Sequence, residues 1–405
     1  MAKIKGDVLK MAALAKAIVS CVISLVLSMS PGLKFNEGVS TEYENYDNVI
    51  LLIGDGMGVN TVKAAKAFYG IDYDLNMETM PVHAFSKTDS VYGETTDSAA
   101  GGTALAAGIH TYNGSIGTYH WDPLAWYTQP QNITELAMSM GKAAGVVTTD
   151  ATTGATPSSF SAHVNNRGNS WEIVRQQLHS GIDLIWGGTN TYAYKEYVEE
   201  CGYTYVSNAD ELAEVTYGTK SYAQFDSADL KNVTNNSNTP TIDVMTSKAI
   251  EVLSQDEDGF FLMVEGACID KFSHSNEFPG MSKSLMEFDK AVGEALEFAK
   301  EDGNTLVVVT ADHETGGIMY DEAKGEYYYT KGGHSSADVP LYVSAADAGF
   351  TDGEAVLNRQ VGAQLAHVLG ASPEDYPTLM DGCLVDFSFK EFGKALKYFF
   401  SIIGK

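Results

Sequence analysis

The stretch from Val49 to Gly56, VILLIGDG, decides how this sequence folds. Five consecutive apolar residues, three of them β-branched, run directly into a glycine, an aspartate and a second glycine. A short continuous apolar run of this kind is typical of a strand that is buried on both faces of a parallel sheet. Three further runs have the same form and also end at polar residues: Ala144–Thr148, Phe260–Val264 and Thr305–Thr310.

Segments with a helical pattern lie between these runs. They are Asn60–Tyr69, Ser98–Ala107, Ile133–Met140, Trp171–Leu178, Met245–Leu253 and Lys283–Lys300. The alternation predicts an α/β fold with a doubly wound, mostly parallel central sheet and helices on both faces. Ligands of such sheets bind beyond the carboxyl ends of the strands. Because Asp55, Glu265 and Asp312 stand where three strands end, we expect one shared site there.

The stretch from 187 to 238 is polar, rich in Tyr and Asn, and has no clear periodicity. We interpret it as surface loops and short elements of the same domain. The sequence shows no internal repeat and no low-complexity linker. Residues 45–386 are therefore predicted to form a single domain.

The charge of the chain restricts its partners. Its 405 residues include 26 Lys and Arg against 53 Asp and Glu, a formal net charge of -27. Nucleic acids and anionic membranes attract cationic surfaces, so neither is expected as the main partner. The acidity by itself fits a solubilising surface. Because only Arg167, Arg175 and Arg359 are arginines, a site for an anionic substrate would need another source of positive charge, and metal ions are candidates.

The first 30 residues resemble an export signal. Lys3, Lys5, Lys10 and Lys16 precede an apolar run from Ala17 to Met29. This run of 13 residues is short for a membrane-spanning helix, which needs roughly 20 apolar residues. We predict a cleaved signal peptide, with an uncleaved anchor or lipoprotein and an ordinary buried helix as alternatives. The expected location is extracytoplasmic: secreted, periplasmic or at the cell surface. The four cysteines, Cys21, Cys201, Cys268 and Cys383, form no disulfide framework, and free thiols are favoured over a single bridge.

Residues 387–405 form a second special segment, predicted to be an amphipathic helix. Its apolar stripe consists of Phe389, Phe392, Leu396, Phe399, Phe400 and Ile403, with lysines elsewhere. Such a helix either packs on the body or on a dimer partner, or it lies on a membrane surface. Membrane or cell-wall association through either terminal segment is therefore an open alternative.

Ser98 opens an Ala- and Gly-rich run in the segment from Thr96 to Leu105, TDSAAGGTAL. At a helix N-terminus, free N–H groups and the helix dipole favour an anion. Alone, the serine is more simply an N-cap. The glycines next to it allow close approach of another element or a ligand.

Five residues of metal-ligand type follow further along the chain. Asp270 and His274 are four residues apart, so on a helix they share one face and can bind one ion. Asp312 and His313 follow a buried strand, and His334 lies in the loop GGHSS. Each alone is more often structural. Together, these mixed Asp/His sets fit zinc.

The remaining candidates divide into two groups. Asp55, Glu265 and a threonine hydroxyl are oxygen ligands of the kind that magnesium prefers. The other histidines are not accompanied by further ligand-type residues in a comparable pattern, so we interpret them as structural or surface residues: His83, His110, His120, His163, His179 and His367.

The segments that carry these residues resemble the alkaline phosphatase family. The matching stretches are Asn48–Gly58, Gly93–Gly108, Ala155–Arg167, Phe261–Asn276, Asn304–Gly317 and Gly332–Tyr342. They appear in the order expected for the family and extend over most of residues 45–345. The resemblance implies hydrolysis of phosphate monoesters through a phosphoserine, two Zn²⁺ and one Mg²⁺ per subunit, and a homodimer. The alternatives are a related metallo-hydrolase that acts on phosphodiesters or sulfate esters, and a non-catalytic phosphate- or metal-binding protein.

The resemblance also assigns roles to individual residues. Ser98 would attack phosphorus, and Asp97 would help to hold Arg167, which binds the phosphate oxygens. The implied metal ligands are Asp270, His274 and His334 for one zinc, Asp55, Ser98, Asp312 and His313 for the other, and Asp55, Thr156 and Glu265 for magnesium.

The chain departs from the family pattern at Gly154, where the family usually has Asp or His beside the magnesium site. Lys271 matches some bacterial members, in which it pairs with that carboxylate and contacts phosphate through water. We therefore expect weaker or altered occupancy of the third metal site and a Lys271 that reaches phosphate more freely, unless Asp150 substitutes from the same loop. Restoring Asp at position 154 is expected to tighten the magnesium dependence.

Overall fold

The computed structural model describes residues 40, 42–118, 129–225 and 238–371. All of the described residues belong to one compact unit. Several predictions fall outside the described residues. They concern the signal segment 1–30, the C-terminal helix 387–405, the last residues of the predicted domain, His120, Cys21 and Cys383. Those predictions stay predictions.

The described elements alternate along the chain as the sequence predicts. The strands are β1 Asn48–Ile53, β2 Val82–Lys87, β3 Ala143–Ala151, β4 Leu184–Gly188, β5 Thr204–Val206, β6 Ser221–Phe225, β7 Phe260–Glu265, β8 Thr305–Thr310, β9 Glu314–Thr315, β10 Met319–Asp321, β11 Glu326–Tyr328, β12 His334–Ser335, β13 Val339–Val343 and β14 Ala355–Leu357. The α-helices are α2 Val59–Tyr69, α3 Ser98–Ala107, α4 Ile133–Ser139, α5 Ala155–Ser159, α6 Ser170–Ser180, α7 Lys195–Glu200, α8 Ala209–Ala213, α9 Ile242–Leu253, α10 Cys268–His274, α11 Phe278–Asp302 and α12 Asn358–Val368, and the 3₁₀ turns are η1 Asn76–Thr79 and η2 Val91–Gly93.

Ten of the described strands form one twisted sheet in the order β14-β2-β13-β8-β1-β7-β3-β4-β6-β5. From β8 to β5 every neighbouring pair is parallel. Strand β13 is antiparallel to both of its neighbours, and β14 is parallel to β2. The predicted fold class, a mostly parallel doubly wound sheet, is confirmed.

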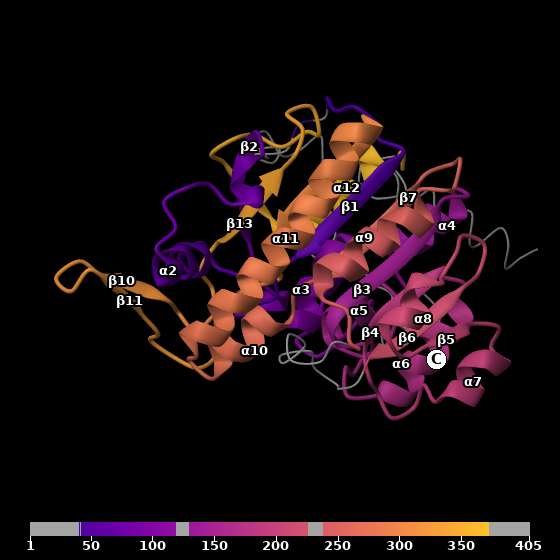
Figure 1. The fold of residues 1–405 in the computed structure, drawn as a ribbon. Coiled ribbons are helices and arrows are strands. Elements are labelled where there is room, and N and C mark those ends of the chain that lie inside the picture. The colour runs from indigo at the N-terminus through magenta and orange to yellow at the C-terminus, as the bar shows by residue number, and fades with distance from the viewer. Residues whose placement is uncertain (1–39, 41, 119–128, 226–237, 372–405) are drawn as a thin grey trace, which may run out of the picture. The chain divides into compact units, whose positions relative to one another are not determined.

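The central strand β1 shows why helices cover both faces. Its six residues are all buried, and alternate side chains point to opposite faces. Ile50 and Leu52 pack in one apolar core with residues of α2, α9 and α11. Val49, Leu51 and Ile53 pack in a second core with residues of α3, α4 and α12. Helices α9 and α11 lie together over the first face in Figure 1.

The register of the strands brings their carboxyl ends to one edge. Ile53 at the end of β1 stands beside Glu265 of β7 and Thr310 of β8. Thr148 of β3 stands beside Glu265 on the other side. The loops after four neighbouring strands therefore start side by side, which is the location that the sequence predicts for the shared site.

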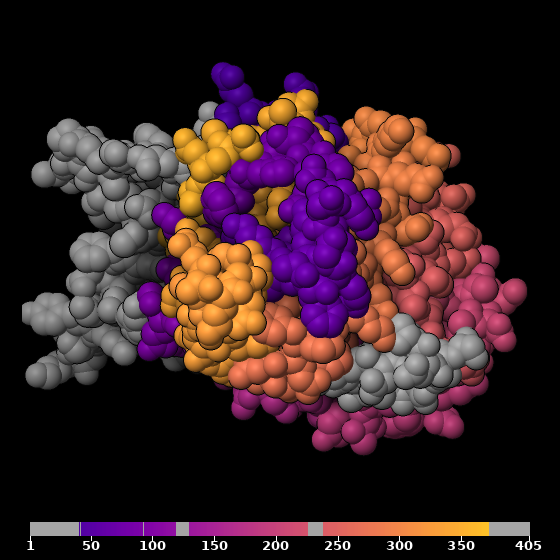
Figure 2. All heavy atoms as spheres, turned by 60° about the vertical axis from the view of Figure 1, so that its left-hand side comes forward, coloured from indigo at the N-terminus to yellow at the C-terminus, as the bar shows by residue number. Residues whose placement is uncertain are grey.

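Two small antiparallel pairs lie outside the main sheet, β10 with β11 and β12 with β9. The β10–β11 hairpin lies next to α2 at the surface in Figure 1 and Figure 2. At its base, Asn60 Nδ2 of α2 donates a hydrogen bond of 2.8 Å to the carbonyl of Ile318. Within the described residues, no helix combines the length and the apolar character that crossing a membrane requires.

The interpretation of 187–238 as surface loops is wrong in part. Its described residues contain short elements, as expected, but β5 and β6 are strands of the main sheet, and every residue of β6 is buried. Polar residues made β6 inconspicuous. Ser221 accepts a hydrogen bond from Trp186 Nε1 at 2.9 Å, and Gln224 accepts one from the Asn190 backbone at 2.6 Å, so both are buried with partners.

Candidate metal and phosphate site

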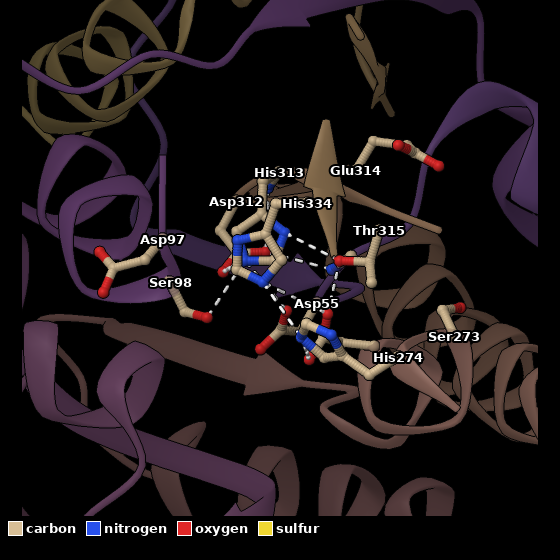
Figure 3. A network of polar contacts seen from close by, with 12 residues as sticks. Asp55, Asp97, Ser98, Ser273, His274, Asp312, His313, Glu314, Thr315 and His334 are labelled. Carbon is tan, nitrogen blue, oxygen red and sulfur yellow. Dashed lines mark hydrogen bonds and ion pairs between the residues drawn. The ribbon is translucent and has the colours of Figure 1, made fainter. Parts of the chain in front are cut away.

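Most of the predicted ligand residues lie together at the carboxyl edge of the sheet, and Figure 3 labels Asp55, Ser98, His274, Asp312, His313 and His334 among them. The strand ends and the following loops carry Asp55 after β1, Glu265 at the end of β7, and Asp312 and His313 after β8, while α10 carries Asp270 and His274 and β12 carries His334. β12 pairs with β9, which brings the loop of His334 back to the residues that follow β8. Residues far apart in the sequence thus meet at one place.

Ser98 is the first residue of α3, and its side chain points into this cluster (Figure 3). It is buried, and its Oγ lies 3.1 Å from Nε2 of His313. The helix comes close because Gly101 has no side chain: a Cβ there would lie 2.6 Å from the Asp312 carbonyl oxygen. The glycine therefore sets the approach of the serine to the ligand residues.

Asp270, His274 and His334 form one group of potential ligands. The two Nε2 atoms of the histidines are 3.2 Å apart. Asp270 Oδ2 is 3.3 Å from Nε2 of His274, and Oδ1 is 3.8 Å from Nε2 of His334. These three side chains present one carboxylate and two imidazoles to a common point, which is a donor set suited to zinc.

The second nitrogen of each histidine fixes the orientation of its ring. His274 Nδ1 lies 2.7 Å from the carbonyl of Gly332, and His334 Nδ1 lies 2.9 Å from the carbonyl of Thr96. A carbonyl oxygen can only accept a hydrogen bond, so each Nδ1 is the donor, and the neutral form of each ring has its lone pair at Nε2. Two such lone pairs facing each other at 3.2 Å fit a shared cation.

Asp55, Asp312 and His313 form a second group, and all three are buried. His313 Nε2 is 3.5 Å from Asp55 Oδ1 and 3.3 Å from Asp312 Oδ2. Both of these carboxylate oxygens are buried without a hydrogen-bond donor. A buried acceptor without a donor costs about 1–3 kcal/mol, so these atoms also fit a cation. By distance, His313 belongs as well to a group with Asp270 and His334.

Thr315 joins the two groups. Its hydroxyl donates a hydrogen bond of 2.5 Å to Asp270 Oδ1 and lies 3.3 Å from His313 Nδ1. Because the single hydroxyl proton goes to the carboxylate, His313 Nδ1 is the donor toward the hydroxyl oxygen. The lone pair of His313 is therefore at Nε2, on the side of Asp55, Asp312 and Ser98.

Candidate oxygen ligands for a third cation are Asp55 after β1, Thr156 on α5 and Glu265 at the end of β7. Glu265 is buried, and Thr148 donates a hydrogen bond to its Oε2. The Thr156 hydroxyl is buried and has no hydrogen-bond partner. With the unpaired oxygen of Asp55, these residues provide hard oxygen donors of the kind that magnesium prefers.

The ionisation of the cluster reflects crowded negative charge. Burial, followed by the charges of Asp312, Asp270 and Glu265, raises the pKa of Asp55 well above its usual range. Burial and the charge of Asp150 raise the pKa of Glu265 to about 8. Burial lowers the pKa of His313 to about 3, so its ring is neutral. Buried acidic side chains beside a neutral imidazole match a site that binds divalent cations.

Asp97 and Arg167 form an ion pair beside Ser98. Arg167 Nη1 donates to Asp97 Oδ2 at 2.9 Å, and the Arg167 side chain is 40% exposed. The carboxylate also caps α3 by accepting from Ala100 N at 3.0 Å, and it accepts from Gly114 N at 2.9 Å. A rigidly held carboxylate thus anchors one arm of a guanidinium next to the start of α3.

Lys271 is held by a carboxylate from β3. Its Nζ lies 2.7 Å from Asp150 Oδ1, and both side chains are partly buried. Of the two alternatives left open for Lys271, free access to phosphate or a pairing with Asp150, the structure has the pairing. Asp150 is the partner.

Comparisons with known proteins identify the family of this chain. The family model described as alkaline phosphatase matches residues 46–197 and 187–344. Alkaline phosphatase 4 of Bacillus subtilis is 34% identical over 302 residues, which are 69% of this chain and 63% of the relative. The alkaline phosphatase of Escherichia coli K12 is 34% identical over 332 residues, 66% of this chain and 69% of that protein. The chain belongs to the alkaline phosphatase family.

Solved alkaline phosphatases share the fold. The enzyme of the Antarctic bacterium TAB5 has a TM-score of 0.69 and 29% identity, covering 82% of this chain and all of that one. The Thermus thermophilus alkaline phosphatase has a TM-score of 0.73 at 18% identity, over 87% of this chain and 99% of that one, a likeness of fold. The chain spans about two thirds of the length of the two Bacillus subtilis relatives that it matches, 63% and 66%.

Within this alkaline phosphatase fold, sequence reasoning missed the residues that hold the ligands. Thr315 and Thr148 bond to Asp270 and Glu265, and Glu314 accepts hydrogen bonds from the Gly317 and Ile318 backbone beside them. The one sequence signal for Glu314 and Thr315 is that they directly follow His313, and Thr148 has no such signal. Of the described histidines, those interpreted as structural belong to neither ligand group.

Proposed function

We propose that this chain is a phosphatase that hydrolyses phosphate monoesters to an alcohol and inorganic phosphate, with Ser98 as the nucleophile. The observation that carries the proposal is the position of Ser98 Oγ, 3.1 Å from His313 Nε2 and at the first turn of α3. A serine in that position faces a ligand cluster and has the free N–H groups of a helix N-terminus behind it. Both features favour an attack on a phosphoryl group.

Two zinc ions and one magnesium ion are the proposed cofactors. Asp270, His274 and His334 would hold one zinc, Asp55, Ser98, Asp312 and His313 the other, and Asp55, Thr156 and Glu265 the magnesium. When bound, such ions lower the pKa of a coordinated hydroxyl or water and neutralise charge on the attacking and leaving oxygens. The unpaired buried oxygens of Asp55, Asp312 and Thr156 support the assignment. Variants of the TAB5 enzyme with Mg in the M3 site support a third ion in the family.

The protein groups would act in two displacements. In the first, Ser98 Oγ forms a bond to phosphorus as the bond to the leaving oxygen breaks, and the alcohol takes up the proton that the serine loses. In the second, water breaks the Oγ–phosphorus bond, which regenerates Ser98 and releases inorganic phosphate. Arg167, anchored by Asp97, would bind non-bridging phosphate oxygens throughout. Lys271 would add a positive charge on the side of Asp150.

Arg167 favours a monoester over a diester. Its guanidinium presents a fork that matches two free oxygens of a phosphate dianion. A diester carries a substituent on one of those oxygens, which removes a charge and obstructs the fork. The alternative activity, on phosphodiesters or sulfate esters, uses the same nucleophile and metals and differs mainly at this contact.

The test compares 4-nitrophenyl phosphate with bis(4-nitrophenyl) phosphate, using protein treated with EDTA and then reloaded with zinc and magnesium. We expect faster cleavage of the monoester, loss of activity in EDTA, and recovery after reloading. Faster cleavage of the diester would overturn the choice of substrate. Full activity after verified removal of the metals would overturn the proposed site.

Assembly and location are further parts of the proposal, and they rest on the resemblance and on the N-terminal sequence. We propose a homodimer in an extracytoplasmic location. Light scattering of the purified protein gives the mass of the assembly, and a monomer would contradict the first part. N-terminal sequencing after cell fractionation tests the second part, and uncleaved chain in the cytoplasm would contradict it.

A further inference from the structure

The side chain of Asp150 fills the space beside Gly154. A Cβ built on Gly154 would lie 2.4 Å from Asp150 Oδ2 and 2.9 Å from its Cγ. The backbone itself does not demand glycine, because Gly154 has φ -53° and ψ 156°, angles that other residues adopt. A side chain at position 154 would therefore require the carboxylate of Asp150 to move.

Asp150 is fixed from several directions. Its Oδ1 accepts hydrogen bonds from Lys271 Nζ at 2.7 Å and from Ala151 N at 2.8 Å. Its backbone N–H donates to Thr148 Oγ1 at 2.8 Å, and that hydroxyl donates to Glu265. One residue thus connects the cation Lys271 to the carboxylate that is proposed to bind magnesium.

This connection matters for a magnesium-type site because the ion retains several waters. Those waters need acceptors around the protein ligands, and a carboxylate next to the ligands can supply them. Asp150 Oδ2 faces the gap left by Gly154, at the start of the short helix that carries Thr156. The missing side chain at position 154 and the carboxylate of Asp150 are therefore two parts of the same local structure.

We propose that Asp150 is a positioning residue of the third cation site. It supplies, from the end of β3, the carboxylate that a side chain at position 154 would otherwise provide, and it holds Lys271. The inference rests on the proposed function and adds a residue to it. It also reverses the expectation for Gly154→Asp: with Asp150 in place, the new side chain collides with it and weakens the magnesium site.

The test is a double-mutant cycle on magnesium binding. Asp150→Ala, Gly154→Asp and the double variant are loaded with zinc, and magnesium is titrated into each by calorimetry. A thermal melt with and without magnesium gives a second readout. Asp150→Asn keeps the volume of the side chain without its charge, so it reports on the site if a larger change impairs folding. The exposed Asp210→Asn, which also removes one negative charge, is the matched control.

We expect Asp150→Ala and Asp150→Asn to weaken magnesium binding about 10- to 100-fold. Gly154→Asp alone should also weaken it. The double variant should bind more tightly than either single variant, because removal of the Asp150 side chain makes room for the new carboxylate. Asp210→Asn should bind as the wild type does.

Unchanged magnesium affinity in Asp150→Asn would overturn the inference. A double variant that binds magnesium no more tightly than Asp150→Ala would also overturn it, and so would a wild type that binds no magnesium. The proposed function is read separately, from monoester cleavage by the zinc-loaded wild type. If the wild type cleaves the monoester and Asp150→Asn binds magnesium as the wild type does, only the inference about Asp150 is contradicted. Absence of cleavage by fully loaded wild type sinks the proposed function.

Discussion

The hydroxyl of Thr315 donates a 2.5 Å hydrogen bond to Asp270 Oδ1. The hydroxyl oxygen of Thr315 accepts a hydrogen bond from His313 Nδ1 at 3.3 Å, so one threonine orients a residue of each ligand group. A ligand held in this way loses little freedom when it binds an ion, and partners of this kind commonly affect metal affinity. Removal of the Thr315 hydroxyl should therefore weaken the binding of the metal ions.

Thr315→Val should weaken zinc binding about 10- to 100-fold, because valine has the shape of threonine but cannot donate to Asp270. Thr315→Ser keeps the hydroxyl and should bind zinc nearly as the wild type does. Competition with a chromogenic chelator measures the affinity of both. Equal zinc affinity in the valine and serine variants would show that the hydroxyl does not position the ligands.

Arg167→Ala should lower kcat/KM for a monoester about 10- to 100-fold. Hydrogen bonds to charged groups contribute about 1.5–3 kcal/mol, and this side chain would be in direct contact with phosphate. The control is Arg175→Ala, because Arg175 is also partly exposed and pairs with Glu172 on α6. A loss of the same size in both variants would contradict a specific role for Arg167.

Gly101→Ala should lower both stability and activity. The new Cβ would lie 2.6 Å from the Asp312 carbonyl, so α3 must move away from the loop after β8. Overpacking of this kind costs about 1–3 kcal/mol, and it shifts Ser98 relative to His313. Urea unfolding and steady-state kinetics measure the two effects. Wild-type stability and kcat would mean that the helix approach is not set by this glycine.

The ion pair of His163 with Glu135 should make stability depend on pH. Burial lowers the pKa of His163, but the hydrogen bond and charge of Glu135 outweigh it and raise the pKa above its usual value. Burial raises the pKa of Glu135, and the hydrogen bond and charge of His163 reverse this, so it falls below its usual value. The pair is therefore fully stabilising between the unfolded-state values, about 4.3 and about 6.5.

Above that window, the contribution is lost as the pH rises through the folded pKa of His163. Below it, the contribution is lost as the pH falls through the folded pKa of Glu135. A double-mutant cycle with His163→Gln and Glu135→Gln, measured by urea unfolding, should give a coupling of about 1 kcal/mol or less at pH 5.5, since Glu135 is 41% exposed. The same coupling at pH 9 would refute the charged pair.

The fold could be predicted from sequence wherever strands are apolar on both faces. β1, β7 and β8 are buried throughout and appear as continuous apolar runs, and the predicted α3 has the observed limits Ser98–Ala107. β2 alternates between buried and exposed residues, and β6 contains buried polar residues with partners. Because neither strand gives a long apolar run, these parts of the sheet were missed.

The candidate site could be predicted as a set of ligand types in a particular order. The sequence could not show which side chain lies beside each ligand, because that depends on contacts between distant elements. Thr315 meets Asp270 across 45 residues, and Asp150 meets Lys271 across 121. For the same reason, the sequence left open whether Gly154 frees Lys271 or Asp150 substitutes for the missing carboxylate, and the contact that decides between them is visible only in the structure.

Detection of a phosphate ester on Ser98 would test the proposed nucleophile most directly. The zinc- and magnesium-loaded protein is mixed with a monoester, quenched in acid within the first turnover, digested and examined by mass spectrometry, with Ser98→Ala as the control. We predict phosphate on the peptide that contains Ser98, and neither phosphate nor normal turnover in Ser98→Ala. Phosphate on another residue, or full activity in Ser98→Ala, would contradict the assignment of Ser98.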